Sequence, residues 1–221
     1  MAARLVGAGH TLTVYNRSPS ATRGFEGKAR IAAHPREALD AEVVITMLAD
    51  DAAVEAVWTG LELPAGAIHL NMATVSVELA RRFAQRQARY VAAPVFGRPA
   101  AAAKGELDII AAGAPESVAR CQPLFEVLGR QVFVVGGEPG QANAVKIARN
   151  FLLATVIEGL GEAVALARAC GVPAEEFVKV ITSTSLAAPA WRVRPSPKSR
   201  MDISYSVPIL TGNFSSDINN R

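Results

Sequence analysis

The feature that most restricts the fold of this chain is a regular alternation of short β-rich segments with helix-like ones. Strand-like runs are expected over residues 11–15, 29–33, 43–47, 67–70 and 90–91. Helix-like segments lie between them, over residues 35–39, 50–58 and 75–87. Parallel strands need crossover connections of this kind. The alternation therefore predicts an α/β fold, a doubly wound parallel sheet with helices on both faces.

The strand expected at 43–47, Val-Val-Ile-Thr-Met, is almost continuously apolar. Such a run is typical of a strand that is covered on both faces. The alternation then continues with a strand over 107–112, a helix over 115–128 and a strand over 131–135. We therefore expect the sheet to extend to about residue 135.

The pattern changes after residue 140. Residues 141–169 contain no proline and only two glycines, which predicts one apolar helix of roughly 40 Å. The sequence Gly171-Val-Pro173 ends it, and another helix is expected over 175–181. After Trp191 the chain is rich in Pro, Ser and Asn and has no helical period, which favours a disordered tail. Three parts are expected: an α/β domain, a long helix with the start of an all-α domain, and a tail, over 1–140, 141–191 and 192–221.

Composition and charge exclude several classes of protein. Hydrophobic residues make up 50% of the 221, too many for an intrinsically disordered chain. The net charge of +3 lies wholly in the expected tail, since residues 1–191 carry equal numbers of basic and acidic groups. The charged groups of the tail are Arg192, Arg194, Lys198, Arg200 and Arg221 against Asp202 and Asp217. A nucleic-acid-binding domain would carry its basic face on the folded body, so we expect no nucleic-acid partner.

The two cysteines, Cys121 and Cys170, cannot form a disulfide framework and lie in apolar helical patterns. We expect buried, reduced thiols. No apolar run approaches the roughly 20 residues of a membrane span, and the N-terminus is a poor secretory signal. A cytoplasmic protein without membrane contact and without a metal site is therefore expected.

Asn16 and Arg17 follow the strand expected at 11–15. In a doubly wound dinucleotide-binding fold the second strand ends beside the adenosine ribose. An arginine there neutralises the 2′-phosphate of NADP, and the Ser18 hydroxyl is suited to donate to the same phosphate. This pattern predicts NADP as the cofactor, with NAD possible. The alternative is an exposed arginine in a turn.

The glycine-rich phosphate loop of such folds has no counterpart here, because no Gly-x-Gly-x-x-Gly follows an expected strand. Gly7-Ala-Gly9 precedes the strand at 11–15. Gly136-Gly137 and Gly140 follow the last strand but lack the form of the fingerprint.

Four stretches, in order and spacing, resemble the β-hydroxyacid dehydrogenase family, the group of 3-hydroxyisobutyrate dehydrogenase and 6-phosphogluconate dehydrogenase. Residues 1–17 resemble the end of the family's first helix and its second strand, and Asn71-Met-Ala-Thr74 resembles the turn beside the nicotinamide. Residues 93–99, Ala-Pro-Val-Phe-Gly-Arg-Pro, resemble the substrate motif, and residues 140–150 the catalytic helix. The resemblance covers about residues 1–190 and implies a Rossmann-like domain followed by an all-helical one.

By this resemblance Lys146 is the catalytic lysine and Asn150 the substrate asparagine, in a cleft between the domains. The two lie at i and i+4, on one helix face, and the apolar neighbours of Lys146 favour a lowered pKa suited to proton exchange. A lysine that only extends from a core helix toward water is the alternative. The residues implied to contact the cofactor, besides 16–18, are Met47, Leu48, Ala49 and Thr74.

The substrate motif departs from the commonest family form. Phe96, Gly97 and Arg98 stand where many members have serine and two glycines, and Ala92 stands at the family's aspartate. The backbone amides at 96 and 97 are still suited to an anionic group, and Arg98 to a carboxylate. Because Phe96 makes the pocket bulkier and more apolar, 3-hydroxyisobutyrate itself is not the expected substrate.

Met1 aligns inside the family's first helix, so the family's first strand and glycine loop have no counterpart in this sequence. That strand is central in the order 3-2-1-4-5-6. We expect the remaining strands either to close up or to leave a gapped sheet, and cofactor binding to be weak or absent. The resemblance fades near residues 187–191, and the simplest interpretation is a chain truncated at both ends.

The leading hypothesis is an NADP-dependent oxidoreductase that transfers hydride between nicotinamide C4 and the carbonyl or hydroxyl carbon of a small acid or semialdehyde. Lys146 would donate or accept the proton. One alternative is an imine-reductase-like enzyme, against which Lys146 speaks, and another is a non-catalytic or inactive dehydrogenase-like module. The expected partners are a small-molecule substrate and, in the full-length form, a second copy of the chain as a homodimer.

Overall fold

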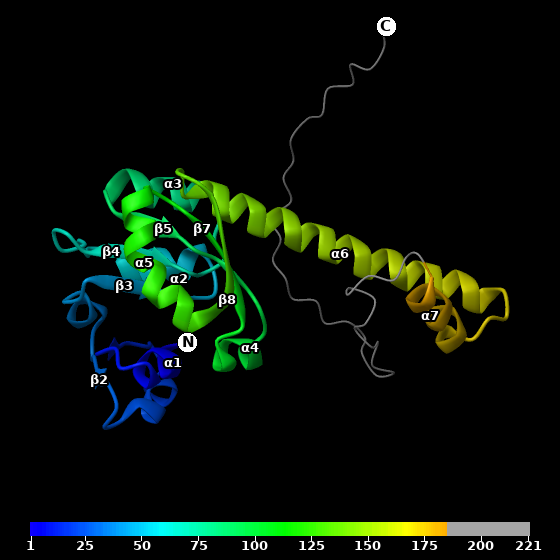
Figure 1. Cartoon of the computed structure of the whole chain (residues 1–221), viewed down its shortest axis with the longest axis horizontal. Helices are drawn as coiled ribbons and strands as arrows, with labels where there is room; N and C mark the ends of the chain where they lie inside the picture. The colour runs from blue at the N-terminus through cyan, green and yellow to red at the C-terminus, as the bar shows by residue number, and fades with distance from the viewer. Residues whose placement is uncertain (185–221) are drawn as a thin grey trace, which may run out of the picture. The chain divides into compact units, whose positions relative to one another are not determined.

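The computed structural model describes residues 1–184 in two compact units, of which the first covers Met1–Thr155 and the second begins at Val156 (Figure 1). The unit boundary lies within one long helix. The disordered tail predicted over 192–221 and the end of the predicted helical part, 185–191, lie outside the described residues.

The first unit contains a six-stranded sheet with the order β3-β4-β5-β7-β6, in which β8 also pairs with β7. The strands are β3 (Val43–Thr46), β4 (Ile68–Asn71), β5 (Tyr90–Ala92), β6 (Val95–Phe96), β7 (Leu107–Ala112) and β8 (Gly129–Gly136). Neighbours in the β3-β4-β5 run are parallel, as are β7 and β8, whereas β7 is antiparallel to β5 and β6. The α/β fold with helices around a largely parallel sheet is as predicted.

Two further strands form a separate parallel pair, β1 (Thr13–Val14) and β2 (Arg30–Ile31). The strands therefore do not close up into one sheet. The gapped sheet, the other outcome expected from the sequence, is observed. Short 3₁₀ turns connect this region: η1 (Pro19–Ala21), η2 (Arg23–Phe25) and η3 (Pro35–Ala38). The last of these replaces the helix predicted at 35–39.

Residues 43–47 are covered on both faces, as predicted, but only in part: Val43 and Ile45 pack against one hydrophobic cluster and Val44 against the other. Val43, Val44 and Ile45 are only half-buried, and Met47 is 52% exposed. The reason is that β3 lies at the edge of the six-stranded sheet, with β4 as its only neighbour in the sheet order.

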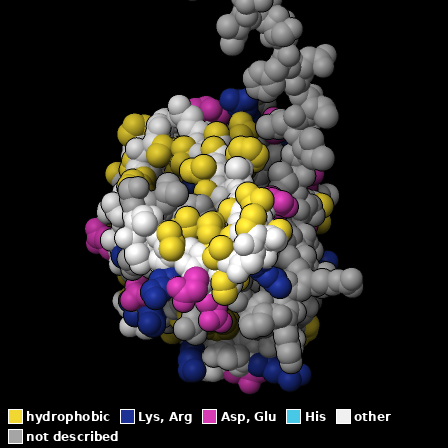
Figure 2. All heavy atoms as spheres, turned by 90° about the vertical axis from the view of Figure 1, so that its right-hand side faces the viewer, with side chains coloured by type: hydrophobic (Ala, Val, Ile, Leu, Met, Phe, Trp, Pro, Cys, Tyr) yellow, Lys and Arg dark blue, Asp and Glu magenta, His cyan; other side chains and the backbone are white. Residues whose placement is uncertain are grey.

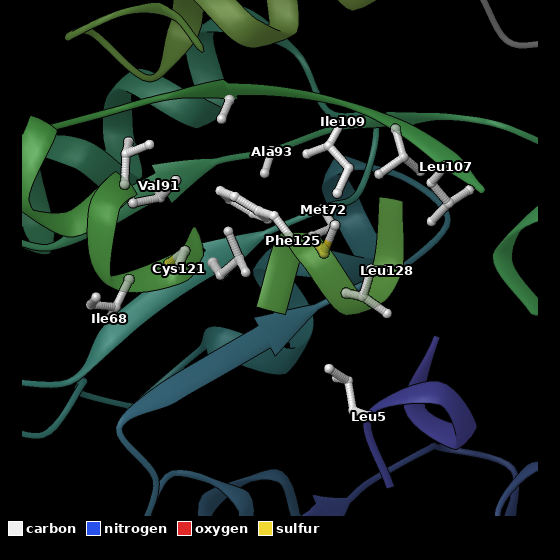
Figure 3. Packing of buried hydrophobic residues seen from close by; sticks show 14 residues of the cluster. Leu5, Ile68, Met72, Val91, Ala93, Leu107, Ile109, Cys121, Phe125 and Leu128 are labelled. Carbon is white, nitrogen blue, oxygen red and sulfur yellow. The ribbon is translucent and has the colours of Figure 1, made fainter. Parts of the chain in front are cut away.

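Side chains alternate between two hydrophobic clusters, one on each face of the sheet, as the two-residue period of a strand requires. Ile68, Leu70 and Val91 join the cluster that contains Leu5 and Phe125, shown in Figure 3. Alternate residues of β5 and β7 join the other cluster, which is built around α2 and α3: Tyr90, Ala92, Ile110 and Ala112.

The five short helices of the first unit are α1 (Ala2–Gly7), α2 (Asp51–Trp58), α3 (Val77–Arg86), α4 (Pro99–Lys104) and α5 (Pro115–Leu128). Two of them, α2 and α3, have a side-chain cap at their N-terminus. The Asp50 carboxylate accepts from the Ala53 amide at 2.8 Å, and the Ser76 hydroxyl accepts from the Leu79 amide at 3.1 Å. Both bonds satisfy amides that the first helical turn leaves free. Helix α4 and strand β6 were not predicted from the sequence.

The long helix predicted over 141–169 is observed as α6 (Gly140–Ala169), and α7 (Ala174–Ser183) follows it. By length and composition alone α6 meets the criterion for a membrane-spanning helix, contrary to our expectation of no such segment. This is weak evidence, because long helices of many proteins that never enter a membrane pass the same test. The helix also carries Glu158 and Glu162, and acidic groups are costly in hydrocarbon.

The described part of the second unit, residues 156–184, contains no buried residue. Leu166, Val172 and Val180 are all at least 40% exposed. The face of the molecule in Figure 2 carries many hydrophobic side chains at its surface. Within its described residues, this unit therefore has no core of its own.

The two cysteines differ. Cys121 is buried in α5, as predicted, and burial raises the pKa of its thiol to about 12. Cys170 is exposed, so the prediction of a buried thiol is wrong there. It follows the last turn of α6, where none of the described residues is buried.

Candidate functional site

Lys146 is the most buried charged side chain described in the first turns of α6, with 9% of its surface exposed. Its Nζ donates to the Val95 carbonyl at 2.7 Å and lies 4.3 Å from the centre of the Phe96 ring. Ala142 and Asn143, four and three residues earlier, are buried on the same helix face. This face of α6 therefore holds the ammonium against β6.

The environment of Lys146 lowers the pKa of its ammonium from 10.5 to about 8. Burial is the larger cause, because it disfavours the charged form, and the positive charge of Arg149 adds to it. A lysine with a pKa of about 8 can both donate and accept a proton near neutral pH.

Asn143 connects α6 to the turn that precedes α3. It is 1% exposed, and its Nδ2 donates to the Val75 carbonyl at 3.1 Å. Its Oδ1 is buried and has no hydrogen-bond partner among the described residues. Sequence reasoning missed this residue. The available signal was a polar side chain three residues before Lys146, on the same helix face.

Phe96 lies half-buried in β6 and contacts two cations. Besides Lys146, the guanidinium carbon of Arg149 lies 4.4 Å from the ring centre. Across the strand pair, Phe96 is opposite Asp108. Arg130 binds both carboxylate oxygens of Asp108, at 2.8 and 2.9 Å. This ion pair and the charge of Arg149 hold the pKa of Asp108 below its usual value.

The other predicted substrate residues are Gly97, Arg98 and Asn150. Gly97 has a φ of +142°, and a Cβ added there would lie 2.7 Å from Leu107 Cδ2, so the backbone requires glycine. Arg98 is exposed and precedes α4. Asn150 is exposed on α6, with no hydrogen bond to Lys146 in the described structure. The predicted roles of these residues stay predictions.

The predicted cofactor residues follow the carboxyl ends of strands, where open α/β sheets bind ligands. Met47 and Ala49 are exposed and Leu48 is half-buried after β3, and Thr74 is exposed after β4. Asn71, just before Thr74, accepts from the Ala73 amide at 3.0 Å and thereby fixes this turn.

Beyond β1, the side chains of residues 16–18 are exposed. The Asn16 side chain accepts from the Ser18 amide at 2.8 Å, which fixes the turn that presents Arg17 to solvent. These residues suit the 2′-phosphate end of a dinucleotide, and the exposed turns after β3 and β4 suit the rest of the molecule. Within residues 1–184, no hydrogen bond or ion pair joins Arg17 to Lys146.

A second buried polar cluster surrounds His69 on β4. The Trp58 indole donates to the Thr46 hydroxyl at 3.1 Å, and this hydroxyl lies 2.8 Å from His69 Nε2. His69 Nδ1 lies 2.6 Å from Gln87 Oε1. Burial is the main cause that lowers the pKa of His69 to about 3, so the ring is neutral. Since an amide oxygen only accepts, Nδ1 carries the hydrogen and Nε2 accepts from Thr46.

Among the described residues, no group of three His, Cys, Asp or Glu side chains could hold a metal ion. The chemistry that the site offers is therefore that of a buried ammonium beside an aromatic ring and an exposed guanidinium.

Comparison with protein families gives two matches that together span most of the chain. The model for the NAD binding domain of 6-phosphogluconate dehydrogenase matches residues 1–136. The model for the NAD-binding region of NADP-dependent 3-hydroxyisobutyrate dehydrogenase matches residues 140–201.

Among curated proteins, the oxidoreductase YfjR of Bacillus subtilis is 40% identical over 195 residues, which cover 83% of this chain and 68% of the relative. The chain spans about two thirds of the length of the curated relatives it matches.

Two solved structures are also similar. The 3-hydroxyisobutyrate dehydrogenase of Mycobacterium tuberculosis with L-serine has a TM-score of 0.78 and 28% identity, and the match covers 88% of this chain and 70% of that one. An imine reductase from Aspergillus terreus in complex with NADPH4 has a TM-score of 0.73 and 28% identity, with 82% and 66% covered.

Proposed function

The chain belongs to the β-hydroxyacid dehydrogenase family of NAD(P)-dependent oxidoreductases, and we propose that it takes part in NADP-dependent reduction or oxidation of a small acid or semialdehyde. When bound, the nicotinamide supplies or takes up the hydride at its C4. Lys146 exchanges the proton on the substrate oxygen. The buried ammonium of Lys146 and its lowered pKa carry this proposal.

The geometry around Lys146 supports proton exchange at one defined place. An ammonium has three N–H donors, and one is used by the Val95 carbonyl at 2.7 Å. This bond and the contact with the Phe96 ring hold the nitrogen in position. At least one further donor is left for a carbonyl oxygen of the substrate. Because the ammonium is little exposed, bulk water competes weakly for that position.

Each direction of the reaction requires one protonation state of Lys146. In carbonyl reduction the ammonium donates a proton to the developing alkoxide, and in alcohol oxidation the neutral amine accepts it. The pKa of about 8 leaves both forms populated near neutral pH. Asn150, one helical turn further on, is proposed to hold the same substrate oxygen.

Three exposed residues beyond β1 support the preference for NADP. Arg17 provides the charge for a 2′-phosphate, and Asn16 and Ser18 flank it in a fixed turn. We propose that Met47, Leu48, Ala49 and Thr74 contact the remainder of the cofactor.

The test compares Lys146→Met with Lys104→Met, which removes an exposed lysine at the end of α4. NADPH oxidation is followed with a panel of small semialdehydes. We expect Lys146→Met to lower kcat/KM by roughly 10²- to 10⁴-fold, and Lys104→Met to leave it unchanged. Retained activity in a folded Lys146→Met protein would remove Lys146 from its role.

A separate measurement addresses cofactor binding. NADPH fluorescence titration of the chain, with Arg17→Ser as the comparison, reports affinity without turnover. We expect weak binding by the unmodified chain, which has no counterpart of the glycine loop. The variant should bind NADPH about tenfold more weakly still and NADH equally well. No binding by the unmodified chain would favour the non-catalytic module instead.

Imine reduction is a second candidate, because the fold is shared with imine reductases and Phe96 makes the corner apolar. A panel of cyclic imines assayed beside the semialdehydes separates the two. Turnover of imines alone, unaffected by Lys146→Met, would establish this second candidate.

A further inference from the structure

Arg149 occupies an unusual position for an exposed cation. Its guanidinium carbon lies 4.4 Å from the centre of the Phe96 ring. The ring is half-buried, and β6 is paired with β7 by register contacts at Val95 and Phe96, so the surface beneath the guanidinium is fixed. A guanidinium against an aromatic face keeps the edge that carries its N–H donors free for a ligand.

No carboxylate within the described residues neutralises Arg149. No hydrogen bond or ion pair of the described structure involves its side chain. Asp108 is near enough for the charge of Arg149 to lower the pKa of its carboxyl. Both oxygens of Asp108, however, are already bound by Arg130, in the bidentate geometry that satisfies a carboxylate best.

The corner therefore holds an excess of positive charge. Lys146 and Arg149 both contact one ring, and after burial the charge of Arg149 is the second cause of the lowered pKa of Lys146. The Asp108–Arg130 pair adds no net charge. An anion bound at Arg149 would relieve the repulsion between the two cations and would find an arginine with all its donors available.

We propose that Arg149 is the anion anchor of the substrate site and selects small substrates that carry a carboxylate. This inference rests on the proposed function, since it places the substrate between Arg149 and Lys146. Because both cations contact the same ring, a ligand that reaches both must be short. The carboxylate lies on Arg149, the apolar carbons lie against Phe96, and the reacting oxygen lies at Lys146.

In this assignment Phe96 supports the guanidinium of Arg149, and Arg149, in place of Arg98, binds the carboxylate. Phe96 replaces the serine found in many family members, and in this chain the ring serves as the support of a guanidinium. Arg98 is also exposed but has no ring contact or hydrogen bond in the described structure. Arg149 is therefore the better-positioned of the two cations.

The test measures binding without turnover, with isobutyrate and the neutral isobutyramide as probes in ligand-observed NMR titrations. The proteins are the unmodified full chain, Arg149→Gln, Arg149→Lys, and the matched control Arg168→Gln, an exposed arginine of the same helix. We expect the unmodified chain to bind isobutyrate about tenfold more tightly than isobutyramide. Arg149→Gln should lose this preference, Arg149→Lys should keep part of it, and Arg168→Gln should keep all of it.

Equal binding of the two probes by the unmodified chain, or a preference that survives Arg149→Gln, would overturn the inference. Because the titrations require no reaction, failure of this inference and failure of the proposed function give different results. Loss of carboxylate preference in Arg149→Gln without any NADPH oxidation by the unmodified chain would retain the anchor and reject the oxidoreductase activity. Turnover by an unmodified chain that shows no carboxylate preference would retain the oxidoreductase activity and reject the anchor.

Discussion

Two buried polar clusters of the first unit differ in how completely their hydrogen bonds are satisfied. In the His69 cluster each polar group has a partner, in a chain from the Trp58 indole through Thr46 and His69 to Gln87. In the Lys146 cluster the Asn143 Oδ1 has no partner among the described residues. Arg149, beside it, has neither hydrogen bond nor ion pair there.

The difference indicates separate roles. Buried polar groups in native proteins are nearly always satisfied, because an unsatisfied one costs roughly 1–3 kcal/mol. The His69 cluster meets this rule and is packed by aromatic rings, with the Trp58 and His69 centroids 4.1 Å apart. It is a structural element. The Lys146 cluster leaves the buried Asn143 Oδ1 without a partner among the described residues, as expected where a ligand completes the network.

The largest effect should come from His69→Ala. The substitution removes a fully buried ring that contacts Trp58, Phe83 and Tyr90 and leaves Gln87 without its partner. We expect a loss of about 3 kcal/mol in the free energy of unfolding, measured by urea denaturation. The exposed His34, changed to Ala, serves as control. An equal loss in both variants would contradict the structural role of His69.

The titration of His69 should give the next effect. Its folded-state pKa of about 3 lies below the unfolded value of 6.5, so the unfolded state binds more protons between these values. The stabilisation is thus complete above about pH 6.5 and is lost as the pH falls. For this group alone, stability should drop by about 2 kcal/mol between pH 7 and pH 5. Urea midpoints at both pH values check this. The change in stability between the two pH values should be smaller in His69→Gln but not in His34→Gln.

The smallest effect tests the Lys146 cluster through its pH dependence. Because reduction needs the ammonium, kcat/KM for carbonyl reduction should fall above pH about 8, by about tenfold per pH unit at most. The groups that face this ammonium are Arg149 on its own helix, the Val95 carbonyl and Phe96 ring of β6, and the Asp108–Arg130 pair beyond. Arg149→Gln removes a repelling charge, so the inflection should move to higher pH. A shift to lower pH would contradict the like-charge contact.

The sequence predicted the elements whose patterns are local. The strand Leu107–Ala112 and the helix Pro115–Leu128 match their predicted bounds, because alternation and a proline at the first helical position mark them. The edge position of β3 was not predictable, since it depends on which strands pair and not on the apolar content of residues 43–47. The antiparallel orientation of β7 relative to β5 and β6 likewise depends on tertiary pairing.

The candidate site was predictable only in part. The resemblance pointed to Lys146, and the structure adds that burial and Arg149 tune the pKa of its ammonium. Asn143 and Arg149 were not predicted as site residues, because each is a single polar residue in a helical pattern. Their significance depends on contacts with Val75 and Phe96, which lie far away in the sequence.

The left-handed backbone at Gly97 limits how this protein can be redesigned. Any side chain at that position meets Leu107 and demands a strained φ. Libraries that aim to alter substrate choice should therefore randomise Phe96 and Arg98 together with Arg149 and leave the intervening glycine untouched. Diversity spent on that one position would be lost to misfolded clones.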